Sequence, residues 1–220
     1  MKKGLTELVF ILDRSGSMGG LESDTIGGFN GMLRKQQKQG GEANVTTVLF
    51  DDQIEVVHDQ FPIAVVEPLT EDDYYVRGCT ALLDAIGTTI KKIENIQKRL
   101  PESMRAENVI FVITTDGLEN ASQEYSAKTV KQMVARSQEK GWQFIFLGAN
   151  IDAIGEAEKI GIPKTHAATY RNDSKGVKLN YMAATKVVTC LRSDKLNVGE
   201  KALKIPEFLQ PIKDHMSEKE

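Results

Sequence analysis

The stretch Leu8-Val9-Phe10-Ile11-Leu12-Asp13-Arg14-Ser15-Gly16-Ser17-Met18 decides how this chain is expected to fold. Its first five residues are apolar and end at an acid, a short run that is typical of a buried β-strand. The following residues place the carboxylate of Asp13 and the hydroxyl groups of Ser15 and Ser17 on a turn that leads into a helix. Oxygen donors of this kind are the ligands that Mg²⁺, Mn²⁺ and Ca²⁺ prefer.

Two later segments supply further oxygen donors. The tripeptide Gly78-Cys79-Thr80 opens an amphipathic helix and offers the hydroxyl of Thr80. The run Val109-Ile110-Phe111-Val112-Ile113-Thr114-Thr115-Asp116-Gly117 predicts a second buried strand that ends in an acid. Because parallel strands place their carboxyl ends at one edge of a sheet, Asp13 and Asp116 are expected to meet there, with the hydroxyl groups between them.

This three-part pattern, DxSxS followed by a lone Thr and then TDG, resembles the metal-ion-dependent adhesion site of von Willebrand factor A (vWA) domains. The resemblance covers roughly residues 5–192 and is strongest to the small stand-alone bacterial members, including those near tellurium-resistance operons. All five ligand types occur in the expected order, as Asp13, Ser15, Ser17, Thr80 and Asp116.

Apolar runs alternate with amphipathic stretches along the chain, which predicts an α/β fold with a doubly wound, Rossmann-like sheet and helices on both faces. The three residues 51–53 are too few for a crossover, so the strands on either side form a hairpin and one of them is an antiparallel edge strand. The resemblance implies six strands in the order 3-2-1-4-5-6, with the first and fourth adjacent. Strands are expected over 5–13, 45–50, 54–61, 109–115, 142–147 and 166–170, and helices over 20–38, 81–99, 126–140, 153–160 and 177–191.

The predicted domain covers residues 1–192, and residues 193–220 form a C-terminal tail that is either packed on the domain or partly disordered. This tail contains Pro206 and Pro211 and ends in charged residues. Within the helix expected over 20–38, Gly27, Gly28 and Gly31 lower the helix propensity, and we expect them to permit close contact with the sheet.

The composition of the chain narrows the range of partners and locations that we expect. The 220 residues are 40% apolar and 27% charged, with a formal net charge of −3. Without a basic surplus, nucleic acid is not expected as a partner. Cys79 and Cys190 are the only cysteines; both are expected to be small buried residues, which is typical of a reducing compartment. No signal peptide or membrane helix is expected. We therefore expect a cytoplasmic, monomeric protein without a membrane partner.

The resemblance implies a function in binding rather than catalysis. Mg²⁺ is the first choice of ion, and the sequence does not separate it from Mn²⁺ or Ca²⁺. Because few of the direct ligands are charged, the ion is expected to accept a carboxylate from a partner protein in place of water. The chain is thus predicted to be a metal-dependent protein-binding domain in which an Asp or Glu of the partner completes the coordination shell.

Simpler interpretations exist for each residue. Ser15, Ser17 and Thr80 are also typical of turns and helix N-caps. Glu119 and Asn120 either support the metal ligands or belong to a solvated loop, the simpler interpretation. Two further acids lie near helix starts. Asp84 is favoured there by the helix dipole, and Asp152 is expected to begin a short helix.

Two alternative functions stay open. A haloacid-dehalogenase-type phosphatase or phosphotransferase would use Asp13 as its nucleophile, but Ser15 stands where that class has its second acid. A scaffold with a vestigial metal site is the other alternative. The serine-hydrolase and P-loop motifs are absent, and the three histidines lack zinc-ligand spacing.

Overall fold

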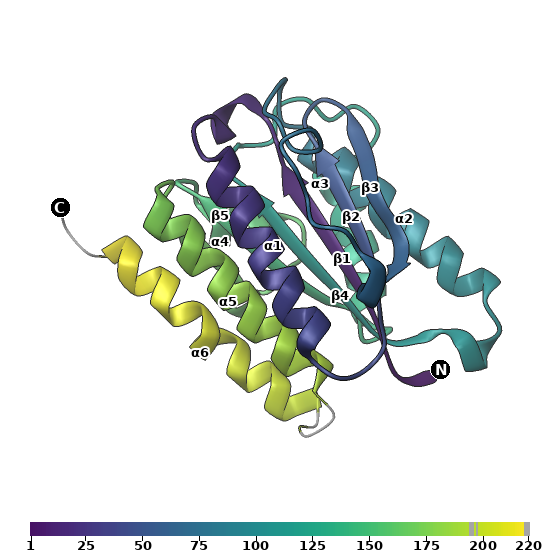
Figure 1. Cartoon of the computed structure of the whole chain (residues 1–220). Coiled ribbons are helices and arrows are strands. Elements are labelled where there is room, and N and C mark those ends of the chain that lie inside the picture. Colours follow the sequence, from purple (N-terminus) through teal and green to yellow (C-terminus); the bar gives the residue numbers. More distant parts are fainter. Residues whose placement is uncertain (194–195, 197, 218–220) are drawn as a thin grey trace.

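The computed structural model describes residues 1–193, 196 and 198–217. A six-stranded sheet in the order β3-β2-β1-β4-β5-β6 forms its centre (Figure 1), and β2 and β3 are its antiparallel pair, which confirms the predicted order and hairpin. The strands are β1 (Lys2–Asp13), β2 (Ala43–Phe50), β3 (Ile54–Pro62), β4 (Ala106–Thr115), β5 (Gln143–Ala149) and β6 (Ala167–Tyr170). The α-helices are α1 (Glu22–Lys38), α2 (Leu82–Arg99), α3 (Ala127–Gln138), α4 (Ala153–Lys159), α5 (Ser174–Arg192) and α6 (Val198–Ser217).

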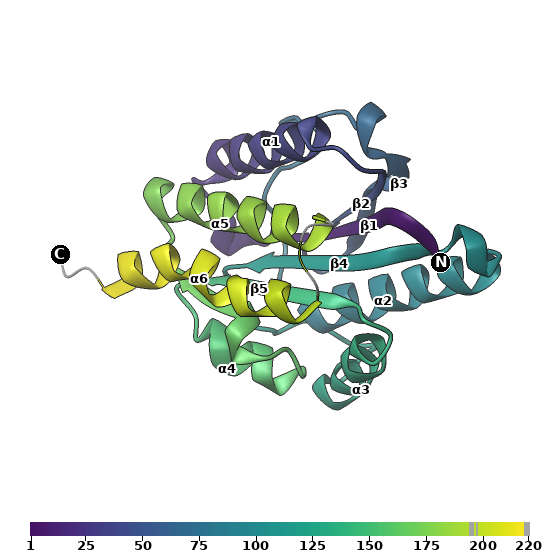
Figure 2. The ribbon, with the colours of Figure 1, turned by 90° about the horizontal axis from the view of Figure 1, so that it is seen from below.

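The centre of the sheet is covered on both faces. Figure 2 shows α1 and α5 over one face and α2, α3 and α4 over the other. Along β1, Leu8, Phe10 and Leu12 belong to the core under α1 and α5, whereas Val9 and Ile11 belong to the core under α2 and α3. Successive side chains of a strand point to opposite faces, so a strand buried on both sides is apolar throughout. This explains the uninterrupted apolar runs of β1 and β4.

The last helix, α6, lies where a tail was expected. It packs beside α5 and over β6, although it contains Pro206 and Pro211. Each proline leaves one backbone carbonyl without its usual helical donor. Those carbonyls lie four residues earlier, on exposed residues, where water can satisfy them. The apolar stripe that holds the helix on the domain consists of Ile205, Leu209 and Ile212. No helix among the described residues combines the length and the apolar character needed to cross a bilayer.

Of the three glycines in α1, only one lies in a close contact with another element. A Cβ atom built at Gly28 lies 2.2 Å from the ring of Tyr181 on α5, whereas one built at Gly27 meets nothing within 4 Å. The close contact is therefore between two helices, not between a helix and the sheet, and only Gly28 requires it.

We expect Gly28→Ala and Gly27→Ala to change stability in opposite directions. The first forces α1 and α5 apart and costs about 1–3 kcal/mol of unfolding free energy. The second replaces an exposed helical glycine and adds about 0.5–1 kcal/mol. Urea denaturation of the two variants measures both effects, and equal midpoints would contradict this account of α1.

A buried carboxyl group lies in the middle of β1. Glu7 has no exposed surface and accepts hydrogen bonds from Gln60 at 3.0 Å, Thr46 at 3.4 Å and Asn44 at 3.5 Å. Burial raises its pKa from 4.5 to about 7, against the lowering effect of these hydrogen bonds. The folded protein therefore favours the neutral carboxyl group.

The raised pKa of Glu7 makes stability depend on pH. Its contribution is complete below pH 4.5 and is lost as the pH rises through about 7, a change of about 3 kcal/mol for a shift of this size. We expect Glu7→Gln to flatten the fall in unfolding free energy between pH 5 and 8. The exposed Glu42, which pairs with Lys2, gives the control Glu42→Gln. A wild-type slope in Glu7→Gln would show that Glu7 does not titrate in this range.

Candidate metal centre

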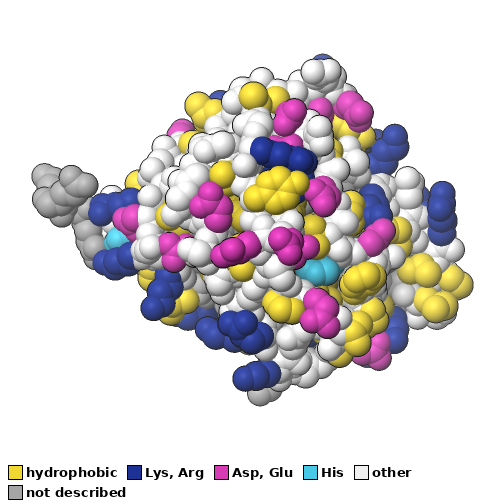
Figure 3. Space-filling view, turned by 45° about the horizontal axis from the view of Figure 1, so that its top comes forward, with side chains coloured by type: hydrophobic (Ala, Val, Ile, Leu, Met, Phe, Trp, Pro, Cys, Tyr) yellow, Lys and Arg dark blue, Asp and Glu magenta, His cyan; other side chains and the backbone are white. Residues whose placement is uncertain are grey.

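The polar ends of β1 and β4 lie side by side. Leu12 is in register with Thr114, so Asp13 lies beside Thr115 and close to Asp116. In Figure 3 this end of the sheet is tilted toward the viewer, and acidic side chains gather around the middle of the face. The parallel pairing of the two strands thus brings Asp13 and Asp116 to one edge, as the crevice rule for such sheets predicts.

Hydrogen bonds connect four of the five predicted ligands to this edge. Asp13 accepts from the backbone N–H of Ser15 at 2.7 Å and from the hydroxyl of Thr115 at 2.5 Å. The hydroxyl of Ser17 donates to Asp116 at 2.6 Å and lies 3.2 Å from the hydroxyl of Ser15. The loop after β1 therefore presents its two hydroxyl groups toward the carboxylate that follows β4.

Thr80, the fifth predicted ligand, reaches the same place from the loop before α2. A Cβ atom built at Gly117 lies 2.4 Å from the Thr80 hydroxyl oxygen, so the hydroxyl packs directly against the residue after Asp116. Only glycine permits this approach. The backbone N–H of Thr80 donates to the side chain of Asn120 at 2.9 Å. Cys79, expected to be buried, is exposed on this loop.

The two carboxylates lack positive partners in the described part of the chain. Asp13 is 1% exposed and Asp116 is 9% exposed, and neither forms an ion pair with any described residue. Burial raises the pKa of Asp116 to about 6; the hydrogen bond from Ser17 lowers it and the charge of Asp13 raises it. Burial also raises the pKa of Asp13. The site thus buries two carboxylates close together, and a bound cation would lower the electrostatic cost of their negative charge.

The donor set fits a small divalent cation with hard ligands. Two carboxylates and three hydroxyl groups are the oxygen donors that Mg²⁺, Mn²⁺ and Ca²⁺ accept. Over residues 1–193, 196 and 198–217, no group of three or more His, Cys, Asp or Glu side chains is arranged to hold a metal ion. Any site at this edge therefore depends on the hydroxyl groups. Binding of an ion by these five residues stays a prediction.

Helix capping does not explain the hydroxyl groups. The residue that caps α1 is Leu21, and the one that caps α2 is Ala81, neither with a side-chain hydrogen bond. Ser15 precedes a short 3₁₀ turn but makes no capping hydrogen bond either. Ser15 thus occupies an N-cap position without a capping hydrogen bond, and neither Ser17 nor Thr80 is the N-cap of α1 or α2. The interpretation of Asp152 as the start of a short helix is confirmed, because its carboxylate accepts from the N–H of Gly155 at 3.0 Å.

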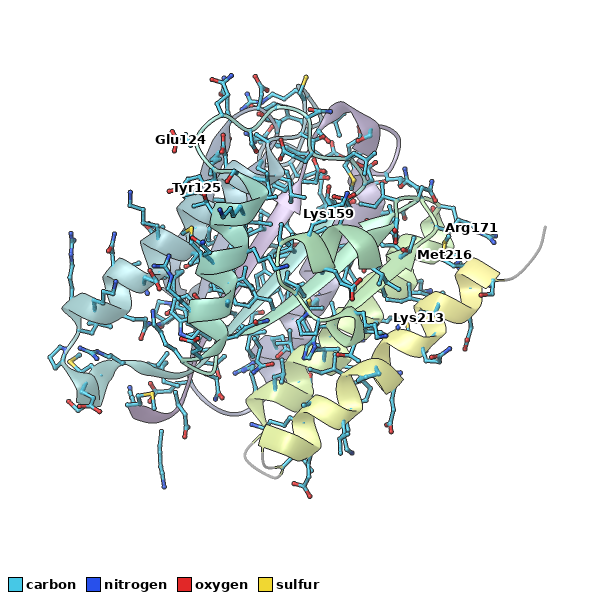
Figure 4. The ribbon with its side chains drawn as sticks, turned by 180° about the vertical axis from the view of Figure 1, so that it is seen from behind. Glu124, Tyr125, Lys159, Arg171, Lys213 and Met216 are labelled. Atoms are coloured by element: carbon cyan, nitrogen blue, oxygen red, sulfur yellow. The ribbon has the colours of Figure 1, made fainter. Side chains whose placement is uncertain are left out.

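The loop after Asp116 is braced by buried and half-buried acids. Glu119 accepts from the N–H groups of Leu83, Ala121 and Ser122, so the solvated-loop interpretation is wrong for Glu119. Asp84 does more than favour the helix dipole, because it accepts from three consecutive N–H groups of residues 123–125 at 2.7–2.9 Å. Figure 4 shows Glu124 and Tyr125 on this loop, above α3. The brace ties the Asp116 loop to the start of α2.

Two further contacts of the site were not predicted from the sequence. The hydroxyl of Tyr74 donates to the backbone carbonyl of Asp13 at 2.6 Å, and the amide of Asn172 lies 3.4 Å from the carboxylate of Asp116. These partners are 61 and 56 residues apart in the chain. No local pattern marks contacts at such separations.

Comparison with known proteins identifies the fold. No protein-family model matches the sequence, and curated protein sequences give no match. Among solved structures, the von Willebrand factor domain of the type V pili tip protein Mfa5 from Porphyromonas gingivalis is 10% identical, with a TM-score of 0.61 over 87% of this chain and 98% of that chain. Manganese-loaded TRAP from Plasmodium vivax is 13% identical, with a TM-score of 0.52 over 81% and 73%.

Proximal thread matrix protein 1 from the mussel byssus is also similar, at 12% identity and a TM-score of 0.58 over 84% of this chain. This chain spans 46% of the length of that protein. At these identities the similarity establishes the architecture, which is that of a vWA domain.

We expect Asp116→Asn to stabilise the metal-free protein and to abolish its response to metal. Removing the buried charge adds about 1–3 kcal/mol to the unfolding free energy at pH 7.5, given the size of the pKa shift. Thermal unfolding with EDTA and with millimolar Mn²⁺ measures both effects. We expect the wild type to gain stability from Mn²⁺, because an ion that binds only the folded state shifts the unfolding equilibrium toward it. A variant that still gains the full Mn²⁺ stabilisation would remove Asp116 from the ligand set.

Proposed function

We propose that this chain is a metal-dependent protein-binding domain. Asp13, Ser15, Ser17, Thr80 and Asp116 hold a divalent cation at the carboxyl edge of the sheet, and an Asp or Glu of a partner protein completes its coordination. The observation that carries the proposal is the pair of buried carboxylates, which have no ion-pair partner among the described residues and lie among three hydroxyl groups from two loops.

The balance of charged and neutral donors favours a ligand from outside. Three of the five proposed donors are uncharged hydroxyl groups. The carboxylates of Asp13 and Asp116 balance the formal charge of a divalent ion but leave it with few charged direct ligands. A bound divalent ion supplies a positive centre that attracts a carboxylate. Asp13 is fixed by Ser15 and Thr115, and Asp116 is fixed by Ser17. The site is thereby organised before the partner arrives, which lowers the entropic cost of binding.

Mg²⁺ is the proposed ion, with Mn²⁺ and Ca²⁺ as alternatives. All three accept hard oxygen ligands, and Mg²⁺ usually keeps several waters, one of which a carboxylate can replace. TRAP from Plasmodium vivax, which shares the fold, is manganese-loaded. Mn²⁺ is therefore a suitable probe of the site, because it is paramagnetic and takes similar ligands.

We propose binding rather than catalysis. Haloacid-dehalogenase-type chemistry needs a second acid two residues after the nucleophile to transfer the proton, and Ser15 occupies that position. Its hydroxyl faces that of Ser17 instead of a base. A cytoplasmic location and a monomeric state, without nucleic-acid or membrane partners, complete the proposal.

The proposal is tested by capture of partners from a native lysate on the immobilised protein, with Mg²⁺ or with EDTA. We expect at least one protein to be retained only with Mg²⁺ and to be lost in Ser15→Ala. Ser103→Ala is the matched control, because Ser103 is exposed on the short 3₁₀ turn Glu102–Met104 before β4. Replacing the acidic residues of the captured partner with amides should then abolish binding.

Three outcomes would overturn the proposal. Equal capture in Mg²⁺ and EDTA would separate binding from the metal. Calorimetry that detects no Mg²⁺ or Mn²⁺ binding at millimolar concentration would favour a vestigial site. Turnover of a phosphomonoester that disappears in Asp13→Asn would favour an enzyme.

A further inference from the structure

Arg14 lies within the loop that carries Ser15 and Ser17, yet its side chain has no exposed surface. Its Nε donates to Oδ2 of Asp51 at 2.9 Å, and its terminal nitrogen lies 2.8 Å from the carboxylate of Glu55. A guanidinium is costly to bury unless such partners compensate it. The first ligand loop is therefore tied to the hairpin turn between β2 and β3.

Asp51 also contacts the second ligand loop. Its Oδ2 accepts from Nε of Arg77 at 2.7 Å, and its backbone carbonyl accepts from the N–H of Ala81 at 2.8 Å. Ala81 directly follows Thr80 in the chain. Asp51 is thus bonded on one side to the loop of Ser15 and Ser17 and on the other side to the loop of Thr80.

Backbone hydrogen bonds join the two ligand loops at the same place. The N–H of Arg77 donates to the carbonyl of Arg14 at 2.9 Å, and the N–H of Gly16 donates to the carbonyl of Gly78 at 3.3 Å. The ring of Tyr75 lies against both guanidinium groups, 5.3 Å from that of Arg14 and 5.4 Å from that of Arg77. Cation–π contacts of this kind restrict where the two arginines can lie.

We infer that Asp51 is a positioning residue of the proposed metal site. It holds the loop of Ser15 and Ser17 at a set distance from Thr80, through Arg14 on one side and Ala81 on the other. The inference rests on the proposed function, because it assigns a role to Asp51 only if those hydroxyl groups bind an ion. Groups that orient metal ligands from outside the coordination shell typically change metal affinity by about 10-fold to 100-fold when replaced.

The test compares Asp51→Asn with Asp59→Asn. The first keeps the shape of the side chain and an oxygen for the N–H of Gln53, which Asp51 accepts at 2.7 Å, but removes the charge that balances Arg14 and Arg77. The second removes an ion pair of similar length, 2.7 Å to Lys92, from strand β3. Mn²⁺ affinity is measured by calorimetry, and the bound ion is examined by electron paramagnetic resonance, at a temperature where circular dichroism shows each variant folded.

We expect Asp51→Asn to weaken Mn²⁺ binding about 10-fold to 100-fold and to change the resonance spectrum of the bound ion. Asp59→Asn should leave both unchanged. If Asp51→Asn lowers the melting temperature but keeps the wild-type affinity and spectrum, its role is purely structural and the inference is wrong. If the wild type itself does not bind Mn²⁺, the proposed function fails instead, so the two failures are distinguishable.

A second variant decides the matter if Asp51→Asn does not fold. Arg77 is 37% exposed, so Arg77→Gln removes one donor to Asp51 while Arg14 continues to compensate its charge. We expect about a 3-fold or greater loss of Mn²⁺ affinity, less than that expected for Asp51→Asn. Wild-type affinity in a folded Arg77→Gln would then overturn the inference.

Discussion

The parallel pairing of β1 with β4 is the constraint on which the site depends. The two strands are far apart in the sequence, and their register places Asp13 beside Thr115, whose hydroxyl donates to the Asp13 carboxylate at 2.5 Å. A slip of one residue would turn Asp13 toward the opposite face of the sheet. The apolar side chains that bury both faces of β1 therefore also determine where the carboxylates meet.

The two buried carboxyl groups of the site lower the stability of the fold. Asp13 and Asp116 are buried, lack ion pairs among the described residues and have raised pKa values. Each feature lowers stability in the absence of a cation. Functional sites commonly keep such unfavourable groups, and surrounding structure compensates for them. Here the compensation comes from the large apolar core on both faces of the sheet and from hydrogen bonds to Ser15, Ser17 and Thr115.

The sequence predicted those features that depend on residues close together in the chain. Continuous apolar runs marked β1 and β4, and the short link at residues 51–53 marked the hairpin, because periodicity and loop length act within a few residues. The order of the strands came from the resemblance of the motif. Helix α6 was not predicted, because Pro206 and Pro211 count against a helix unless their carbonyl partners face water. The contacts of Tyr74 with Asp13 and of Asn172 with Asp116 span 61 and 56 residues, so only the folded structure reveals them.

The placement of Arg14 resolves an apparent conflict in the motif. An arginine between Asp13 and Ser15 would neutralise the ligand carboxylates if its guanidinium turned toward them. Asp51 and Glu55 hold it instead, on the side of the β2–β3 turn. Arg14 consequently forms no ion pair with Asp13 or Asp116. Arg14 thus supports the ligand loop and does not compete with the cation that this loop is proposed to bind.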